Sequence, residues 1–493
     1  MTNFARSLSR SVEWTWFLHC LLFLAGSTAI VAAVIVGEVR VAVAGVVVAI
    51  LLGLAQRDVR LAILGILVYL TFLGDLRRLL VPIAGWSGND PLLLVTPAIT
   101  CLLFAGAILT KRITLDTPVA KATALFMGFM TLQIFNPRQG GLMVGVAGAM
   151  LYLVPMLWFW VGRAFATKSL IRTWLFKIMP VLALCAALMG LYQVFYGWLP
   201  YQLEWFRIAG YSALGPNEDM LRSISIFPNL SEYIQYLGIV IVAACAAAFK
   251  KRGDFMILAI ILFTAIFLAG SRGPVVKILL AVSILYTVQG KSIATWAPRL
   301  AFTLLIGGGM LVWGLTQAGE VATQSAAGNE RVGFVLERQS KLLPSGGEGG
   351  GGTVGIHGNL FWIGIKQGFE QPLGLGIGST TLAGAKYGTT GAGTEKDLTD
   401  MFVAGGIVGG VLYLALVVLV SVSAVRYWQR QQSLLALSFV GILAFMGLSW
   451  LKPGAYVLTP VMWLIIGSLD RFVSIENAQD AEVDHKHLRS SLQ

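Results

Sequence analysis

Long apolar runs follow one another along almost the whole chain of 493 residues and constrain its fold more than any other feature. A helix needs about 20 apolar residues to cross the hydrocarbon core of a bilayer. The mean hydropathy of +0.77 lies well outside the range of soluble proteins. The alternating segments of about ten residues that are typical of a membrane barrel are absent. The sequence therefore predicts an all-α polytopic membrane protein.

The apolar runs divide into about 12–14 membrane-spanning helices, because a few of the runs are short or carry charges. The predicted helices cover roughly 15–37, 39–55, 59–81, 91–110, 117–136, 142–164, 173–197, 230–249, 254–270, 274–289, 299–318, 399–422, 433–450 and 455–469.

The positions of Lys and Arg predict the orientation of the chain. With the N-terminus inside the cell, basic residues fall in every short inside loop, for example Arg57, Lys111, Arg112 and Lys251. Both termini are then cytoplasmic, and 471–493 is expected to be a loose polar tail. The same loops account for the net charge of +12, so the charge indicates no nucleic-acid partner.

Two outside loops, 196–229 and 319–398, are longer than their connections require. In the second loop, 320–343 and 358–370 are expected to form amphipathic helices, and the glycine-rich stretch 345–355 a flexible linker. The sequence GLGIGS at 374–379 looks like a G-x-G motif but opens no helix after a strand, so it does not indicate a phosphate-binding loop. We expect a tight turn there that brings the backbone close to another part of the chain.

The sequence divides into three regions: the N-terminal helices of 1–195, a catalytic-like membrane region of 196–470 and the tail of 471–493.

Two arginines, Arg222 and Arg272, each stand where an apolar span meets the outer face. A cation at a bilayer edge is costly unless it has an anionic partner. Lys277 lies one turn inside the same span as Arg272. A guanidinium group stays charged and offers forked donors that match phosphate oxygens. The pattern points to an anionic, membrane-borne substrate such as a lipid-linked pyrophosphate.

The order of motifs around these arginines resembles that of the bacterial O-antigen ligases and the related polysaccharide polymerases. Arg222 precedes SIFPNLSEY at the start of a span. The dipeptide Ser271–Arg272 stands at the outer end of the next span. The large outside loop contains P-L-G-x-G-x-G at Pro372–Gly378, followed by G-I-V-G at Gly406–Gly409. The resemblance covers about 200–415. Each motif alone is weak, and the specificity lies in their order and common location.

The resemblance implies a GT-C-like fold and a metal-independent, inverting glycosyltransferase in the inner membrane. Such enzymes take a glycan from undecaprenyl pyrophosphate and join it to an acceptor at the outer leaflet. No cofactor and no metal are expected. The expected partners are the lipid-linked oligosaccharide, membrane lipids, and a chain-length regulator or export complex.

The chain departs from the family pattern where ligases carry a histidine, near the end of the large loop. The matching stretch GTEKDLTDMF has no histidine and presents Glu395, Asp397 and Asp400 instead. A carboxylate there is expected to accept the proton of the acceptor hydroxyl. The missing histidine favours a polymerase, with a ligase as the alternative.

Alternatives stay open for several of these residues. Arg77 and Arg78 either contact the diphosphate or glycan, or pair locally with Asp75. Asp397 and Asp400 are either catalytic or ordinary acids favoured by a helix N-terminus. A different class, a transporter or flippase for lipid-linked glycans, is disfavoured because the two halves show no matched repeat.

Overall fold

The structure, a computed structural model, describes residues 37–209, 222–290, 292–325, 329–340, 353–387, 393–394, 397–452 and 455–491. All regular elements in these ranges are helices. Ten of them are long and apolar enough to cross a membrane, and two shorter apolar helices accompany them. The all-α polytopic fold is confirmed. Each predicted helix from 39–55 onward overlaps an observed helix, and the prediction for 15–37 lies outside the described residues.

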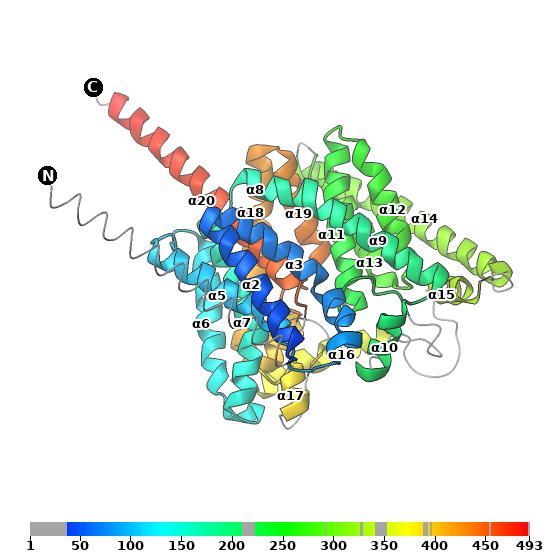
Figure 1. Cartoon of the computed structure of the whole chain (residues 1–493). Helices are drawn as coiled ribbons and strands as arrows, with labels where there is room; N and C mark the ends of the chain where they lie inside the picture. The colour runs from blue at the N-terminus through cyan, green and yellow to red at the C-terminus, as the bar shows by residue number, and fades with distance from the viewer. Residues whose placement is uncertain are drawn as a thin grey trace. The chain divides into compact units, whose positions relative to one another are not determined.

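The chain forms two compact units, whose helices are labelled in Figure 1. Unit 1 comprises Met1–Ile99 and Trp198–Tyr211, and unit 2 comprises Thr100–Gly197 and Ser212–Gln493. These units follow the packing of the helices, whereas the sequence-based division at residue 195 followed the loops and motifs. The helices of unit 1 are α2 (Val39–Arg57), α3 (Val59–Leu79), α4 (Val81–Ala84) and α10 (Pro200–Ala209), and α5 (Leu92–Leu109) contains the boundary at residue 99.

Unit 2 holds the remaining helices. They are α6 (Pro118–Leu132), η1 (Gln133–Phe135), η2 (Pro137–Gln139), α7 (Leu142–Phe165), α8 (Lys168–Thr173), η3 (Trp174–Ile178), α9 (Met179–Tyr196), α11 (Leu230–Phe249), α12 (Asp254–Leu268), α13 (Arg272–Thr287), η5 (Ile293–Thr295), α14 (Trp296–Ser325), α15 (Glu330–Ser340), α16 (Thr353–Glu370), α17 (Leu382–Tyr387), α18 (Asp397–Gln431), α19 (Leu434–Met446) and α20 (Leu458–Ser491).

The core of unit 2 surrounds α11, of which 83% is buried. This helix packs against α9, α12, α13 and α19. Its start is fixed by Asn229, whose side chain accepts a hydrogen bond from the backbone N–H of Glu232 at 3.0 Å. Such a cap satisfies one of the free N–H groups at a helix start.

Small residues bring α7 and α20 into close contact. A Cβ on Gly162 would lie 2.7 Å from the Leu464 carbonyl oxygen, and one on Gly467 would lie 2.0 Å from that of Phe159. Membrane helices often associate through such small residues, because lipid provides no hydrophobic force between apolar surfaces.

The loose tail predicted from residue 471 is wrong, because α20 continues as helix to Ser491. Polar contacts hold its beginning: Arg471 donates to the carbonyl of Ala164 at 2.6 Å, and Asn477 accepts from Arg430 at 2.8 Å. The sequence shows the polar composition but not these partners from distant parts of the chain.

Candidate functional site

Arg222 is positioned by a buried segment that follows it. The Ser223 hydroxyl and the Ser225 backbone N–H both donate to Oε1 of Gln193, at 3.0 and 2.8 Å. The Gln193 amide donates back to the Ser225 carbonyl at 3.3 Å. Ser225 has a φ of 55°, in the left-handed region that is costly for a serine. The half-buried Arg222 is therefore anchored near the C-terminal end of α9, before the start of α11.

Arg272 is the first residue of α13, after Ser271 at the N-cap. A single helix, α12, separates α11 from α13, and α11 and α13 pack against each other. Both begin at the same end of unit 2, so Arg222 and Arg272 belong to that end. Lys277 lies five residues after Arg272, which turns it about 140° around the helix axis. Arg272 and Lys277 thus lie on different faces of α13.

The short helix α15 covers the same end of unit 2. At its start, Asn329 donates to the Phe195 carbonyl at the end of α9, at 3.2 Å. Near its end, Gln339 donates to the Phe267 carbonyl at the end of α12, at 2.5 Å. Leu336 packs against Phe267 and Leu268. The helix α15 therefore bridges the ends of α9 and α12. The last residue of α12, Leu268, lies four residues before Arg272.

The glycine turn at 372–378 pairs with a break in α18. The break is at Gly406, where φ is 63° and ψ is −161°. The carbonyls of Val403 and Ala404 accept hydrogen bonds from the backbone N–H groups of Leu375 and Gly376, both at 2.9 Å. The predicted tight turn that approaches another part of the chain is confirmed, and that part is the backbone of α18.

Asp397 and Asp400 lie in the first turn of α18 and are both only 3% exposed. Asp397 accepts hydrogen bonds from the Leu451 backbone N–H and, at 3.3 Å, from the Tyr413 hydroxyl. Asp400 accepts from the backbone N–H and the hydroxyl of Thr394, at 2.7 and 2.8 Å. The two carboxylates interact electrostatically with each other. The structure thus brings together the two described members of the predicted acidic group, and Glu395 lies outside the described residues.

Two further tyrosines complete the surroundings of the acidic pair. The Leu448 carbonyl, 3.1 Å from the Tyr413 hydroxyl, is a second acceptor for the single proton of that group, beside Asp397. Tyr152 of α7 is an electrostatic neighbour of Asp397 and Asp400, and its hydroxyl lies 3.0 Å from that of Thr380. Sequence reasoning missed both tyrosines, because they lie inside apolar spans and look like ordinary core residues.

Glu232 and Lys452 are charged residues at this end that the sequence analysis gave no role in the site. The Glu232 carboxylate accepts from the backbone N–H groups of Tyr456 and Val457, at 3.1 and 2.7 Å, and so anchors the start of α20. The exposed Lys452 ammonium donates to the Ser231 hydroxyl at 3.0 Å. It is an electrostatic neighbour of Glu232 and Asp397. A charge inside an apolar span is the sequence signal that could have identified Glu232.

Arg77 and Arg78 lie in unit 1 and have local partners there. Arg77 pairs with Asp90 at 2.9 Å, and Arg78 pairs with Asp75 at 3.3 Å. Their guanidinium groups also lie over the rings of Trp86 and Trp205, at 4.7 and 5.5 Å. Such cation–π contacts add to the ion pairs. Of the two alternatives for Arg78, a substrate contact or a local pair, the structure shows the local pair with Asp75.

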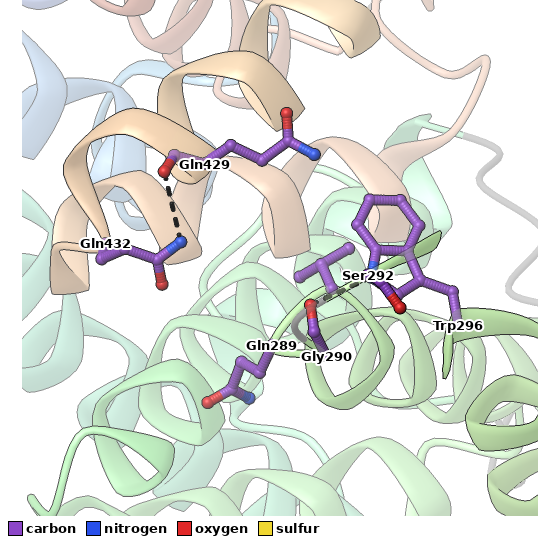
Figure 2. A pocket seen from close by; sticks show the side chains of 7 residues that line it. Gln289, Gly290, Ser292, Trp296, Gln429 and Gln432 are labelled. Atoms are coloured by element: carbon purple, nitrogen blue, oxygen red, sulfur yellow. Dashed lines mark hydrogen bonds between the residues drawn. The ribbon is translucent and has the colours of Figure 1, made fainter. Parts of the chain in front are cut away.

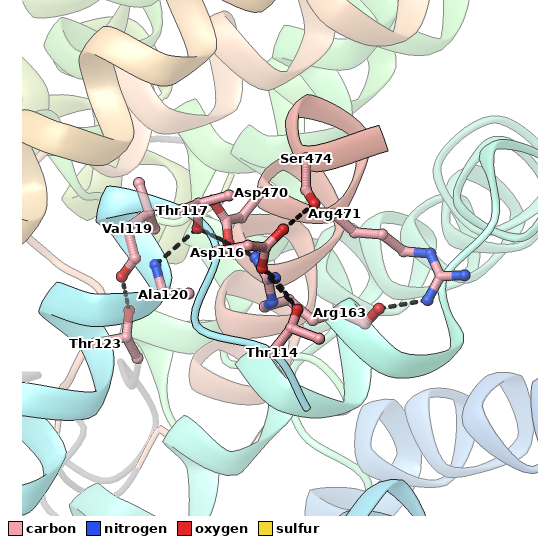
Figure 3. Close-up of polar contacts among 10 residues, drawn as sticks. All are labelled: Thr114, Asp116, Thr117, Val119, Ala120, Thr123, Arg163, Asp470, Arg471 and Ser474. Atoms are coloured by element: carbon pink, nitrogen blue, oxygen red, sulfur yellow. Dashed lines mark hydrogen bonds and ion pairs between the residues drawn. The ribbon is translucent and has the colours of Figure 1, made fainter. Parts of the chain in front are cut away.

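A second polar cluster lies at the opposite end of unit 2, where α7 ends and α6 begins (Figure 3). Arg163 forms ion pairs with Asp116 and Asp470. Burial alone would raise the pKa of the Asp116 carboxyl. Hydrogen bonds from Ser474 and Thr114 and the charge of Arg163 outweigh burial and lower this pKa from 3.8 to about 2. The contacts of this cluster hold α6, α7 and α20 together.

A hollow of about 470 Å³ also lies away from Arg272, at the C-terminal ends of α13 and α18 (Figure 2). Its lining residues are Val288, Gln289, Gly290, Ser292, Trp296, Gln429 and Gln432. The Trp296 indole donates to the Gly290 carbonyl at 3.2 Å, and the Gln432 amide to the Gln429 carbonyl at 3.4 Å. The lining residues in the described part of the chain are apolar or carry uncharged polar groups.

Comparison with known protein families and with curated proteins gives no match for this chain.

Proposed function

We propose that the chain polymerises lipid-linked oligosaccharides at the outer face of a bacterial inner membrane, for a surface or secreted polysaccharide. The donor is an oligosaccharide on undecaprenyl pyrophosphate. In this proposal both termini are cytoplasmic, and the ends of α11 and α13 that carry Arg222 and Arg272 face outward.

One observation carries the proposal. Arg222 precedes α11 and Arg272 begins α13, and these two helices pack together and run in the same direction. Two guanidinium groups at one membrane edge provide the charge and the forked donors that a diphosphate requires. Buried backbone and side-chain contacts hold Arg222 in place through Gln193. A preorganised cation stabilises the charge that develops on a leaving diphosphate.

The reaction is a displacement at the anomeric carbon of the donor sugar. The acceptor hydroxyl oxygen forms the new glycosidic bond while the bond to the pyrophosphate oxygen breaks, and the prenyl diphosphate leaves with that electron pair. The hydroxyl proton passes to a carboxylate of the segment that contains Glu395, Asp397 and Asp400. The hydrogen bonds of Asp397 and Asp400 fix the position of this segment.

The absent histidine in this segment favours a polymerase over a ligase. The glycine turn supports the resemblance to this enzyme class, because Pro372–Gly378 and the segment around Gly406 form one structural unit.

Purified protein in lipid nanodiscs, supplied with the lipid-linked oligosaccharide, is expected to lengthen the glycan. Arg222→Ala and Arg272→Ala should each abolish the longer product without lowering the amount of protein in the membrane. Arg138→Ala is a matched control, because the exposed Arg138 contacts Gln371 outside the proposed site.

Product lengths that stay unchanged in both arginine variants would remove the assignment of the diphosphate site. Glycan attached to a supplied acceptor, without longer chains, would identify a ligase. Labelled lipid that crosses a vesicle membrane with no change in glycan size would identify a flippase.

A further inference from the structure

The helix α16 packs against the first part of α18 through a face of glycines. A Cβ on Gly364 would lie 2.7 Å from the Thr399 side chain, and one on Gly368 would lie 2.8 Å from Phe402. Gly364 and Gly368 are four residues apart and share one face of the helix. This face is buried against α18, so the opposite face points away from it.

The opposite face of α16 has an aromatic edge and a polar edge, and the exposed Ile363 lies at the far side of the polar edge, seven residues before Glu370. Trp362 and Phe369 are seven residues apart, point in nearly the same direction, and are 68% and 60% exposed. Lys366 and Glu370 lie beside them and form an exposed ion pair at 3.6 Å. An aromatic edge next to a charged edge is typical of a helix that lies in a membrane interface.

The end of one neighbouring candidate span lies beside the end of α16. The span Pro118–Phe135 has 18 residues, about 27 Å of helix, which nearly matches the hydrocarbon core. Phe135 at its end is 69% exposed. The adjacent Asn136 donates to the Gly374 carbonyl at 3.1 Å. Leu373, which is 69% exposed and follows α16, therefore lies beside the end of this span.

We infer that α16 lies in the lipid interface of the outer leaflet. Trp362, Phe369 and Leu373 enter the boundary between headgroups and acyl chains, and Lys366 and Glu370 face water. The exposed apolar surface of α6 continues onto α16 through Phe135 and Leu373, and lipid is the partner that covers such a surface. Figure 1 shows α16 and α17 in yellow at the end of unit 2 opposite α8.

This inference concerns membrane contact and does not depend on the proposed glycosyl transfer. Its consequence is that the end of unit 2 that carries α16 rests on the bilayer. The part of α18 with Asp397 and Asp400 packs on the buried face of α16, so these carboxylates lie directly above the lipid surface.

Nitroxide labels at single cysteines test the inference in the full-length chain. The four native cysteines are first replaced by serine, and the protein is placed in nanodiscs of phosphatidylethanolamine and phosphatidylglycerol. Labels are attached after Trp362→Cys, Phe369→Cys, Asn359→Cys or Lys366→Cys. Power saturation then compares the collision of each label with oxygen, which prefers lipid, and with a nickel complex, which prefers water.

Labels at 362 and 369 should collide several-fold more with oxygen than with nickel, and labels at 359 and 366 should show the reverse order. Nickel access at all four positions would overturn the inference, because α16 would then lie in water. Low access of both reagents at 362 and 369 would also overturn it, because protein would then cover this face. Dipolar distances between labels on different chains would show whether that protein is a second copy.

Discussion

Gly406 lies so close to Pro372 that a Cβ on the glycine would stand 2.0 Å from the proline carbonyl oxygen. The two residues are far apart in the sequence, and each belongs to one of the two glycine motifs. The positive φ of Gly406, 63°, is also a conformation that favours glycine. The motifs are therefore two halves of one backbone contact, in which neither side has room for a side chain.

Gly406→Ala should lower the stability of the protein by about 2 kcal/mol or more, because it adds backbone strain and a steric clash. The midpoint of thermal unfolding in detergent measures this loss. Gly128→Ala is the control, because a Cβ at Gly128 in α6 meets no atom within 4 Å. Equal midpoints for the two variants would contradict the proposed close contact.

Asp397→Ala should destabilise the loop between α19 and α20, because the Leu451 backbone N–H loses its acceptor. An unsatisfied buried donor costs about 1–3 kcal/mol. Hydrogen exchange at residues 448–452 should increase relative to the parent protein. Asp397→Asn keeps an oxygen acceptor and should show a smaller increase. Unchanged exchange in the alanine variant would argue against an anchoring role for Asp397.

Arg163→Ala should destabilise the end of unit 2 that Figure 3 shows, because Asp470 would stay buried without its cation. Loss of one partner of a buried ion pair typically costs about 3–5 kcal/mol. The double variant Arg163→Met with Asp470→Leu removes both charges and should recover most of the lost stability. Thermal unfolding of both variants provides the comparison, and an equal loss in the two would exclude a buried-charge penalty as the cause.

The lowered pKa of Asp116 predicts how this end of the protein responds to acid. The folded state holds the pKa near 2, below the ordinary value of 3.8. The carboxylate therefore contributes stability above about pH 4, and this contribution disappears as the pH falls towards 2. Asp116→Asn should lack this part of the acid dependence of the unfolding midpoint. If the unfolding midpoints of the parent and the variant fall in parallel between pH 5 and about 2, protonation of Asp116 is not linked to stability.

The helices were predictable from the sequence because each span must satisfy its own backbone hydrogen bonds in lipid. Even the two shorter helices α12 and α19 overlap their predicted ranges. The turn at Pro372–Gly378 was also predictable as a close backbone approach, although its partner at Gly406 was not. A pattern of glycines shows where a side chain is excluded, but it does not show which distant backbone excludes it.

The polar contacts of the site were less predictable than the helices. Asp397 and Asp400 were found because carboxylates stand out beside an apolar span. Their partners Leu451 and Thr394 contribute backbone N–H groups, which every residue type except proline possesses. Lys452 lies more than fifty residues after Asp397, and only folding brings it into electrostatic range of that carboxylate. The helical tail was missed for the same reason.

The side chain of Gln193 bonds to Ser223 and Ser225, and the Ser225 hydroxyl donates to the Ala186 carbonyl, so α9 holds the turn that follows Arg222. A sliding or rotating motion of α9 would displace Arg222 by a similar amount. Pressure on this one helix, from lipids or from a neighbouring protein, would thus be transmitted mechanically to the charge at the membrane edge.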